Sequence, residues 1–176
     1  MSPEPAWETI SSMTGFRPTA FEGLYGRNHR VCSTPNAPHR FILSTTRRVD
    51  LNEQQQLCDD VGWSRLPIER VRLALENSLM VVGLWLHDPH QPRLVGFARC
   101  IGDGVIEAIV CDVAVHPNYQ GIGLGKQLMT YVLDALRSQQ VNRVTLFADP
   151  DVVEFYSAQG WELEPQQRRC AYWHED

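Results

Sequence analysis

The most informative stretch of this sequence is Val113-Ala-Val-His-Pro-Asn-Tyr-Gln-Gly-Ile-Gly-Leu-Gly-Lys126. Its apolar start indicates a buried strand, and the glycines that follow indicate a turn that opens a helix. The first backbone N–H groups of a helix have no partner inside the helix, and the helix dipole adds positive potential there. Glycines also let a ligand approach the backbone closely. The stretch therefore predicts a turn that binds phosphate groups.

Two common phosphate-binding motifs do not fit this turn. A Walker A loop needs four residues between its glycines, but three residues separate Gly121 from Gly125, and Gln127 stands where the motif needs Ser or Thr. The Rossmann fingerprint G-x-G-x-x-G would need glycine where Lys126 stands. Lys126 is also the only lysine of the chain, against fifteen arginines. The helix dipole disfavours a cation in this first turn, and a bound anion would reverse that effect.

A second motif accompanies the glycine turn. Gln120-Gly-Ile-Gly123-Leu-Gly125 resembles the Q/R-x-x-G-x-G/A signature of the GNAT acetyltransferase superfamily, and Phe155-Tyr156 followed by Gly160-Trp161 resembles that family's F-Y-x-x-x-G-F/W motif. The two motifs agree with the family in order and spacing. Leu146-Phe-Ala-Asp149 with Val152-Val-Glu-Phe-Tyr156 is similar to the chloroplast and cyanobacterial branch that includes serotonin N-acetyltransferase. The resemblance covers about residues 41–173.

We expect one α/β (α+β) domain of the GNAT fold at residues 41–176, preceded by an irregular N-terminal extension at residues 1–40. The patterns predict helices at about 50–60, 67–77, 123–137 and 150–160, and strands at 41–46, 79–86, 93–101, 105–115, 143–148, 161–163 and 168–173. These elements make a mixed, mostly antiparallel sheet of about seven strands with helices on both faces. The resemblance implies a splay between the fourth and fifth of these strands, which pantetheine fills.

Composition excludes several functional classes. The chain has 176 residues, of which 43% are hydrophobic and 21% charged, as is typical of a globular domain. A net charge of -5 argues against non-specific binding to nucleic acid or to an anionic membrane. The five cysteines are odd in number and widely spaced, which favours free thiols over disulfides or a metal site. We therefore expect a cytoplasmic protein, a monomer or a homodimer, that binds no metal.

The resemblance implies roles for particular residues. Backbone N–H groups from Gln120 to Gly125 hold the pyrophosphate of acetyl-CoA, and the backbone of residues 112–115 pairs with pantetheine. The expected cofactor contacts are Val113, Ala114, Val115, Gln120, Gly121, Ile122, Gly123, Leu124, Gly125, Lys126, Asp149, Val153 and Tyr156. Trp63, Leu66, Asp112 and Tyr172 are expected to contact the acceptor.

Two of these residues carry the expected catalysis. The resemblance places Tyr156 beside the sulfur of acetyl-CoA as a general acid, although an aromatic on an amphipathic helix is also typical of a core. Asp112 is a carboxylate inside an otherwise apolar strand, where a charge is costly unless paired or used. It is therefore either the general base or a structural Asp that binds neighbouring amides. Glu107, acting through water, is the alternative base, and His116 is a weaker candidate.

These residues predict an acetyl-CoA-dependent N-acetyltransferase. The branch resemblance implies direct transfer of acetyl to a primary amine, an arylalkylamine such as serotonin or tryptamine. Two alternatives stay open: acetylation of protein N-termini or lysines, and a non-catalytic module that senses acyl-CoA.

Overall fold

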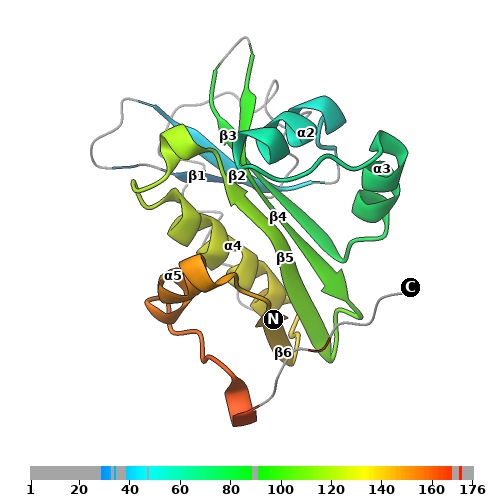
Figure 1. Ribbon diagram of the computed structural model, residues 1–176, viewed down its shortest axis with the longest axis vertical. Coiled ribbons are helices and arrows are strands. Elements are labelled where there is room, and N and C mark those ends of the chain that lie inside the picture. Colours follow the sequence, from blue (N-terminus) through cyan, green and yellow to red (C-terminus); the bar gives the residue numbers. More distant parts are fainter. Residues whose placement is uncertain are drawn as a thin grey trace, which may run out of the picture.

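The structure, a computed structural model, describes residues 29–32, 34, 39–46, 48–88, 91–167 and 171. These residues contain one six-stranded sheet whose strands lie side by side in chain order (Figure 1). The strands are β1 (His29–Cys32), β2 (Phe41–Thr45), β3 (Met80–Leu86), β4 (Arg93–Gly102), β5 (Glu107–Val115) and β6 (Arg143–Leu146). Neighbours from β1 to β5 run antiparallel, and β6 runs parallel to β5. The mixed, mostly antiparallel sheet is thus confirmed.

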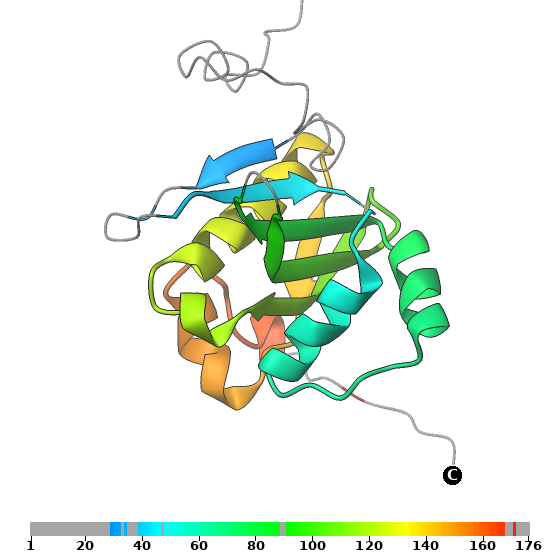
Figure 2. The ribbon, with the colours of Figure 1, turned by 90° about the horizontal axis from the view of Figure 1, so that it is seen from above.

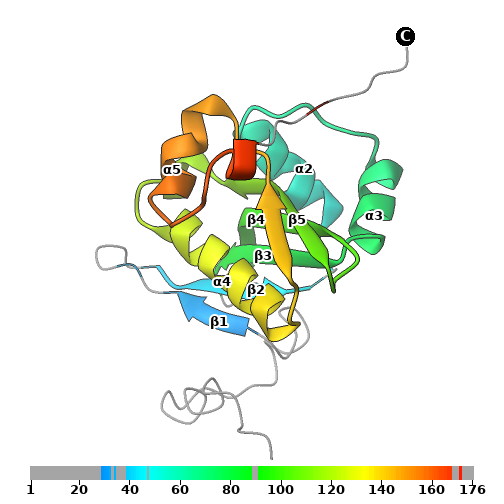
Figure 3. The same ribbon diagram turned by 90° about the horizontal axis from the view of Figure 1, so that it is seen from below.

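Helices cover both faces of this sheet, as predicted. α2 (Leu51–Asp60) and α3 (Ile68–Glu76) lie on one face, and α4 (Leu124–Ser138) and α5 (Val153–Ser157) lie on the other (Figures 2 and 3). Three short 3-10 helices complete the described elements: η2 (Pro117–Tyr119), η3 (Pro150–Val152) and η4 (Pro165–Gln167). Across the described residues, no helix is both long and apolar enough to span a bilayer.

Burial of apolar side chains explains these layers. The central strand β3 is buried along its length except for Leu86, because helices cover it on both faces. α4 buries a stripe with the spacing of an amphipathic helix, made of Leu124, Leu128, Met129, Tyr131, Val132 and Leu136. On the opposite face, Leu57 of α2 packs with Val71 and Leu75 of α3. Each face of the sheet therefore has its own hydrophobic core.

β5 and β6 separate after a short paired segment. Their pairing runs from Glu107 with Arg143 to Val110 with Leu146, where β6 ends. β5 continues to Val115, and among the described residues no strand pairs with the edge of residues 111–115 that faces away from β4. This is the splay that the resemblance implies, between the fourth and fifth predicted strands.

Several expectations about element boundaries were wrong. β1 lies inside residues 1–40, where no regular element is predicted, while the division of the chain at residue 40 stays a prediction. Residues 161–163 form no strand. The predicted strand at 168–173 lies outside the described residues except for residue 171, so the described sheet has six strands against about seven expected. β5 begins at Glu107 because Asp103 Oδ1 accepts three N–H groups and folds Val105 and Ile106 into the turn.

One strand glycine yields a stability prediction. A Cβ built on Gly83 would lie 2.0 Å from Cη2 of the buried Trp85 side chain. Alanine normally stabilises a strand relative to glycine by about 0.5–1 kcal/mol. Here we expect Gly83→Ala to lower the free energy of unfolding by about 1–3 kcal/mol, because the indole must move. Urea denaturation measures this loss. A similar loss in a Trp85→Leu background would show that the indole is not its cause.

Candidate active site

The glycine turn presents a row of free backbone donors at the start of α4. Among the described residues, the N–H groups from Gly121 to Lys126 donate to no backbone acceptor, and the first helical bond runs from Gln127 N to Gly123 O. Gly121 and Gly123 have φ values of +74° and +87°, a region that side chains disfavour. A Cβ at either glycine would have no atom within 4 Å. The turn is therefore an open cradle whose donors and space fit a pyrophosphate.

Neighbouring contacts hold this cradle in place. Gln120 Nε2 donates to Val115 O over 2.8 Å, which ties the turn to the end of β5. A Cβ on Gly125 would lie 3.2 Å from the Phe155 ring, so this glycine allows α4 and α5 to approach closely. Lys126 is exposed in the first turn of α4, as expected for a side chain that could reach a bound anion.

A β-bulge places Asp112 beside the splay. Phe97 of β4 pairs with Ala114, but Arg99 pairs with Cys111, so residues 112 and 113 together oppose Ala98. Asp112 has φ 54°, a left-handed conformation that is uncommon for a residue with a side chain. The bulge interrupts the alternation of β5 and leaves Asp112 exposed.

Asp112 is paired with a basic residue that the sequence analysis missed. Arg99 Nε donates to Asp112 Oδ2 over 2.6 Å, and the two side chains are 19% and 42% exposed. Burial lowers the pKa of Arg99, but the hydrogen bond to Asp112 and its negative charge raise it more, so the guanidinium stays charged. Burial first, and then the negative charge of Asp112, raise the pKa of the Cys58 thiol on α2, a helix that contacts β5.

Tyr156 lies on the opposite face of the sheet from Asp112. Its side chain is 7% exposed and belongs to the core beneath α4. Its ring packs edge-on against Phe155 and Trp161, with centroids at 5.0 and 6.1 Å. Burial first, and then the charge of Asp149, raise the pKa of the Tyr156 hydroxyl. A phenol with a raised pKa keeps its proton at neutral pH, as a general acid must.

Glu107 and His116, the alternative bases, are each engaged in contacts with other residues. Glu107 receives two 3.0 Å hydrogen bonds from Arg143 and lies five positions before Asp112, about 16 Å away along the strand. His116 Nδ1 accepts the Asn118 N–H over 3.1 Å, and its Nε2 lies 3.4 Å from Asp60 Oδ2. Asp112 therefore remains the base candidate nearest the splay.

The structure describes only some of the residues that are expected to contact the acceptor. Trp63 and Leu66 lie in the connection between α2 and α3 and are 39% and 63% exposed. Gln55 Nε2 donates to Leu66 O over 3.0 Å, which anchors this connection to α2. Tyr172 lies outside the described residues. Of the remaining cofactor candidates, Asp149 precedes η3 and Val153 opens α5, and their contact with acetyl-CoA stays a prediction.

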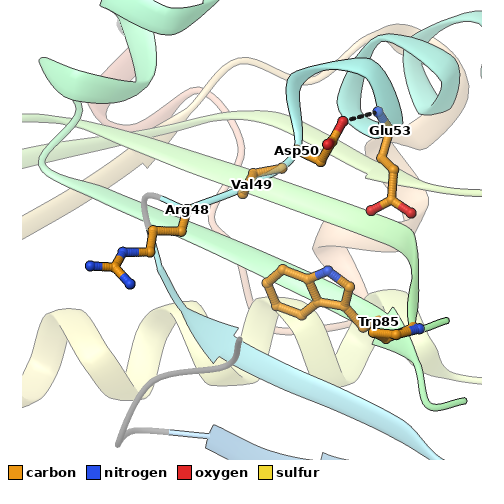
Figure 4. Close-up of a pocket in the computed structure, with 6 residues that line it drawn as sticks. Arg48, Val49, Asp50, Glu53 and Trp85 are labelled. Carbon is orange, nitrogen blue, oxygen red and sulfur yellow. Dashed lines mark hydrogen bonds between the residues drawn. The ribbon is translucent and has the colours of Figure 1, made fainter. Parts of the chain in front are cut away.

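A separate hollow of about 350 Å³ lies beside α2, lined by Arg48, Val49, Asp50, Glu53, Trp85 and Pro92 (Figure 4). None of these residues belongs to the expected cofactor or acceptor sets. Burial, and then the charge of Asp50, raise the pKa of Glu53. Two carboxylates in the lining make the hollow unsuited to the phosphates of acetyl-CoA, whereas the N–H groups of residues 121–126 donate to no backbone acceptor among the described residues. Within the described ranges, no group of three or more His, Cys, Asp or Glu could hold a metal ion.

Comparison with known families agrees with this geometry. The family described as "Acetyltransferase (GNAT) family" matches residues 48–161, which span the chain from the α2 cap to the end of the second motif. The chain belongs to the GNAT family. It is an N-acetyltransferase of this type, and GNAT enzymes use acetyl-CoA and an acceptor substrate.

Individual relatives carry several names. The chain is 54% identical over 154 residues to an "Uncharacterized N-acetyltransferase ycf52-like" protein of Prochlorococcus marinus, with 88% of this chain and 86% of the relative covered. It is 39% identical to "Histone acetyltransferase TAP1" of Glycine max, with 77% and 62% covered. It is 40% identical to "Serotonin N-acetyltransferase 2, chloroplastic" of Oryza sativa subsp. japonica, with 73% and 64% covered.

A solved structure supports the GNAT fold. A GNAT family acetyltransferase from Streptococcus pneumoniae TIGR4 superposes with a TM-score of 0.63 at 26% identity, with 77% of this chain and 98% of that chain covered. In this chain β5 and β6 part after Val110, the glycine turn is tied to the end of β5, and Tyr156 shares a hydrophobic core with α4.

Proposed function

We propose that this protein transfers acetyl directly from acetyl-CoA to a primary amine, with an arylalkylamine such as tryptamine or serotonin as the acceptor. The observation that carries the proposal is the open row of N–H donors from Gly121 to Lys126 beside the unpaired edge of β5. Bound acetyl-CoA supplies an acetyl group activated as a thioester. The protein itself supplies binding, orientation and proton transfer.

In this proposal, Asp112 and Tyr156 act on the reacting groups at the splay from opposite faces of the sheet. Asp112 lies with Arg99 on the α2 side and takes a proton from the acceptor ammonium. The amine nitrogen then bonds to the acetyl carbon as the carbon–sulfur bond breaks. Tyr156, on the α4 side, gives its hydroxyl proton to the leaving sulfur, and the second proton that the nitrogen loses as the amide forms restores the Tyr156 hydroxyl by way of solvent. A backbone N–H near Val113 would stabilise the negative charge that grows on the acetyl oxygen.

The proposed acceptor class rests on two features. Trp63 and Leu66 present exposed apolar surface on the connection between α2 and α3, which suits an aromatic ring. One relative is named as a serotonin N-acetyltransferase. Another is named as a histone acetyltransferase, so a protein amine is the second candidate.

A turnover screen tests the proposed acceptor. The protein is mixed with acetyl-CoA and, separately, with tryptamine, serotonin, a polyamine and a lysine-containing peptide, while free thiol is measured. We expect the highest kcat/KM with tryptamine or serotonin. A higher kcat/KM with the peptide would instead indicate that the protein acetylates protein amines. No thiol release with any amine would favour a non-catalytic acyl-CoA sensor.

Asp112→Asn tests the base. This variant keeps the shape of the side chain and removes its charge, and we expect kcat/KM for tryptamine to fall about tenfold to hundredfold. The rate should recover in part as pH rises, because an alkylamine with a pKa of about 10 then provides more free amine. Measurement of kcat/KM against pH for wild type and Asp112→Asn tests this expectation.

Melting temperature alone cannot decide the role of Asp112. Asn at this position leaves the Arg99 guanidinium without its counter-charge, so some loss of stability is expected on either reading. A pH profile of the same shape as wild type would therefore remove Asp112 from the mechanism.

A further inference from the structure

The two carboxylate oxygens of Asp112 have different surroundings. Oδ2 accepts the Arg99 Nε–H over 2.6 Å, a short bond typical of charged partners. Oδ1 accepts no hydrogen bond from the described residues. One oxygen is therefore fixed by β4, and the other is left for a ligand.

The bulge at Asp112 sets the direction in which the side chain leaves the backbone, but it does not fix the rotation of the carboxylate. The residue lies on a bulge at φ 54°, where the alternation of β5 is broken. The side-chain torsions of an exposed Asp can change between rotamers unless a partner holds the carboxylate. Arg99 lies opposite Cys111 on the regularly paired part of β4, and its side chain is 19% exposed. Arg99, the more buried partner, thus holds the more exposed carboxylate of Asp112.

We propose that Arg99 is a positioning residue for acetyl transfer. It holds Asp112 Oδ2 so that Oδ1 faces the acceptor amine at the splay. Arg99 itself contacts neither the acceptor nor acetyl-CoA, and its effect on catalysis passes through Asp112. This inference rests on the proposed function, since it needs an amine at Asp112.

A planar guanidinium suits this role better than an ammonium group. The Nε–H of Arg has a fixed direction relative to the side chain, whereas the three donors of Lys rotate freely. Arg99→Lys keeps the charge and loses the fixed donor, and Arg99→Gln loses both. We expect Arg99→Gln to lower kcat/KM for tryptamine about tenfold to hundredfold and Arg99→Lys to lower it less. The KM for acetyl-CoA should stay within about twofold of wild type in both variants.

A double-mutant cycle tests whether Arg99 acts through Asp112. If it does, Arg99→Gln combined with Asp112→Asn should be no slower than Asp112→Asn alone. Arg143→Gln is the matched control, because Arg143 also pairs with a carboxylate of β5, at the end of the strand away from the splay. This control should lose some stability and keep its kcat/KM. Additive losses in the cycle, or wild-type activity in Arg99→Gln, would overturn the proposal.

A second measurement does not depend on turnover. In a proton–nitrogen NMR spectrum, the Arg99 Nε–H signal is identified by its loss in Arg99→Lys. We expect it downfield of the other arginine signals in wild type, and shifted upfield in Asp112→Asn. Tryptamine should perturb this signal in wild type and leave it unchanged in Asp112→Asn.

The turnover and NMR measurements distinguish failure of the proposed function from failure of the positioning role of Arg99. If wild type acetylates no amine but tryptamine still perturbs the Arg99 signal through Asp112, the proposed function fails and the positioning of Asp112 stands. If wild type acetylates tryptamine but the Arg99 signal is not shifted downfield, the proposed function stands and Arg99 has no positioning role.

Discussion

Replacing Tyr156 with phenylalanine is expected to lower kcat about 10²–10⁴-fold, the usual contribution of a positioned general acid. The hydroxyl is needed when charge grows on the leaving sulfur and not when acetyl-CoA binds. Affinity for acetyl-CoA should therefore stay close to wild type. Stability should also be little changed, because the hydroxyl makes no hydrogen bond among the described residues while the ring keeps its contacts with Phe155 and Trp161. Steady-state kinetics and calorimetry with CoA measure the two quantities.

The pH dependence of wild type follows from the same residue. Burial and the charge of Asp149 raise the pKa of Tyr156 above its ordinary value of 10.0. An acid acts in its protonated form, and a raised pKa extends the range in which that form dominates. We therefore expect no loss of kcat from ionisation of Tyr156 up to about pH 9, and a fall only above its pKa.

Tyr131 provides a matched control. Its side chain is 8% exposed, against 7% for Tyr156, and it belongs to the same core. Its hydroxyl oxygen accepts the Thr45 N–H over 3.3 Å, so Tyr131→Phe should cost about 1 kcal/mol of stability and leave kcat unchanged. If Tyr156→Phe keeps wild-type turnover while chemistry limits the rate, Tyr156 is a packing residue.

Replacing Gly123 with valine is expected to weaken CoA binding at least about thirtyfold, which corresponds to about 2 kcal/mol. The Cβ would enter the open space next to the free N–H groups, where the pyrophosphate is expected. Valine also disfavours the φ of +87°, so the turn would change shape and its donors would diverge. Calorimetric titration with CoA measures the loss.

Gly62→Val separates the blocked site from simple backbone strain. Gly62 has φ +80° and, like Gly123, has no atom within 4 Å of a built Cβ, but it lies in the connection between α2 and α3. Both variants should lose similar stability, and CoA affinity should fall in Gly123→Val alone. Wild-type CoA affinity in Gly123→Val would refute the placement of the pyrophosphate.

Local patterns were sufficient to predict much of this fold. Asp50 caps α2 through bonds to the N–H groups of Asn52 and Glu53, at the start of the predicted helix of residues 50–60. Gly123 precedes α4 as the glycine turn predicts, and the hydrophobic spacing of α4 matches its buried stripe. These features depend on neighbours in the chain, which a sequence displays directly.

Other features depend on partners far along the chain. β1 is short, and three of its four residues are exposed, so it shows no apolar pattern and forms only because β2 lies beside it. The β-prone residues from Trp161 to Leu163 form no strand in the described structure, and the Trp161 ring instead packs on Tyr156.

The Arg99–Asp112 pair was missed for a different reason. A charged residue within the apolar strand of residues 93–101 was a visible signal, and the hairpin at Gly102 places Arg99 opposite Cys111. The pair itself forms only because the bulge turns Asp112 to the same side as Arg99. A bulge cannot be located from alternation, because it is the position at which alternation fails.

A single-turnover experiment with isotopically labelled acetyl-CoA, excess enzyme and tryptamine tests direct acetyl transfer to an amine. Burial and the charge of Asp112 raise the pKa of both Cys58 and Cys111, which disfavours the thiolate that an acetyl-enzyme would need. We therefore expect the label to move to the amine nitrogen in step with thiol release, with none on the protein at any time. Label that passes first through a cysteine, or thiol release without labelled amine, would contradict the account.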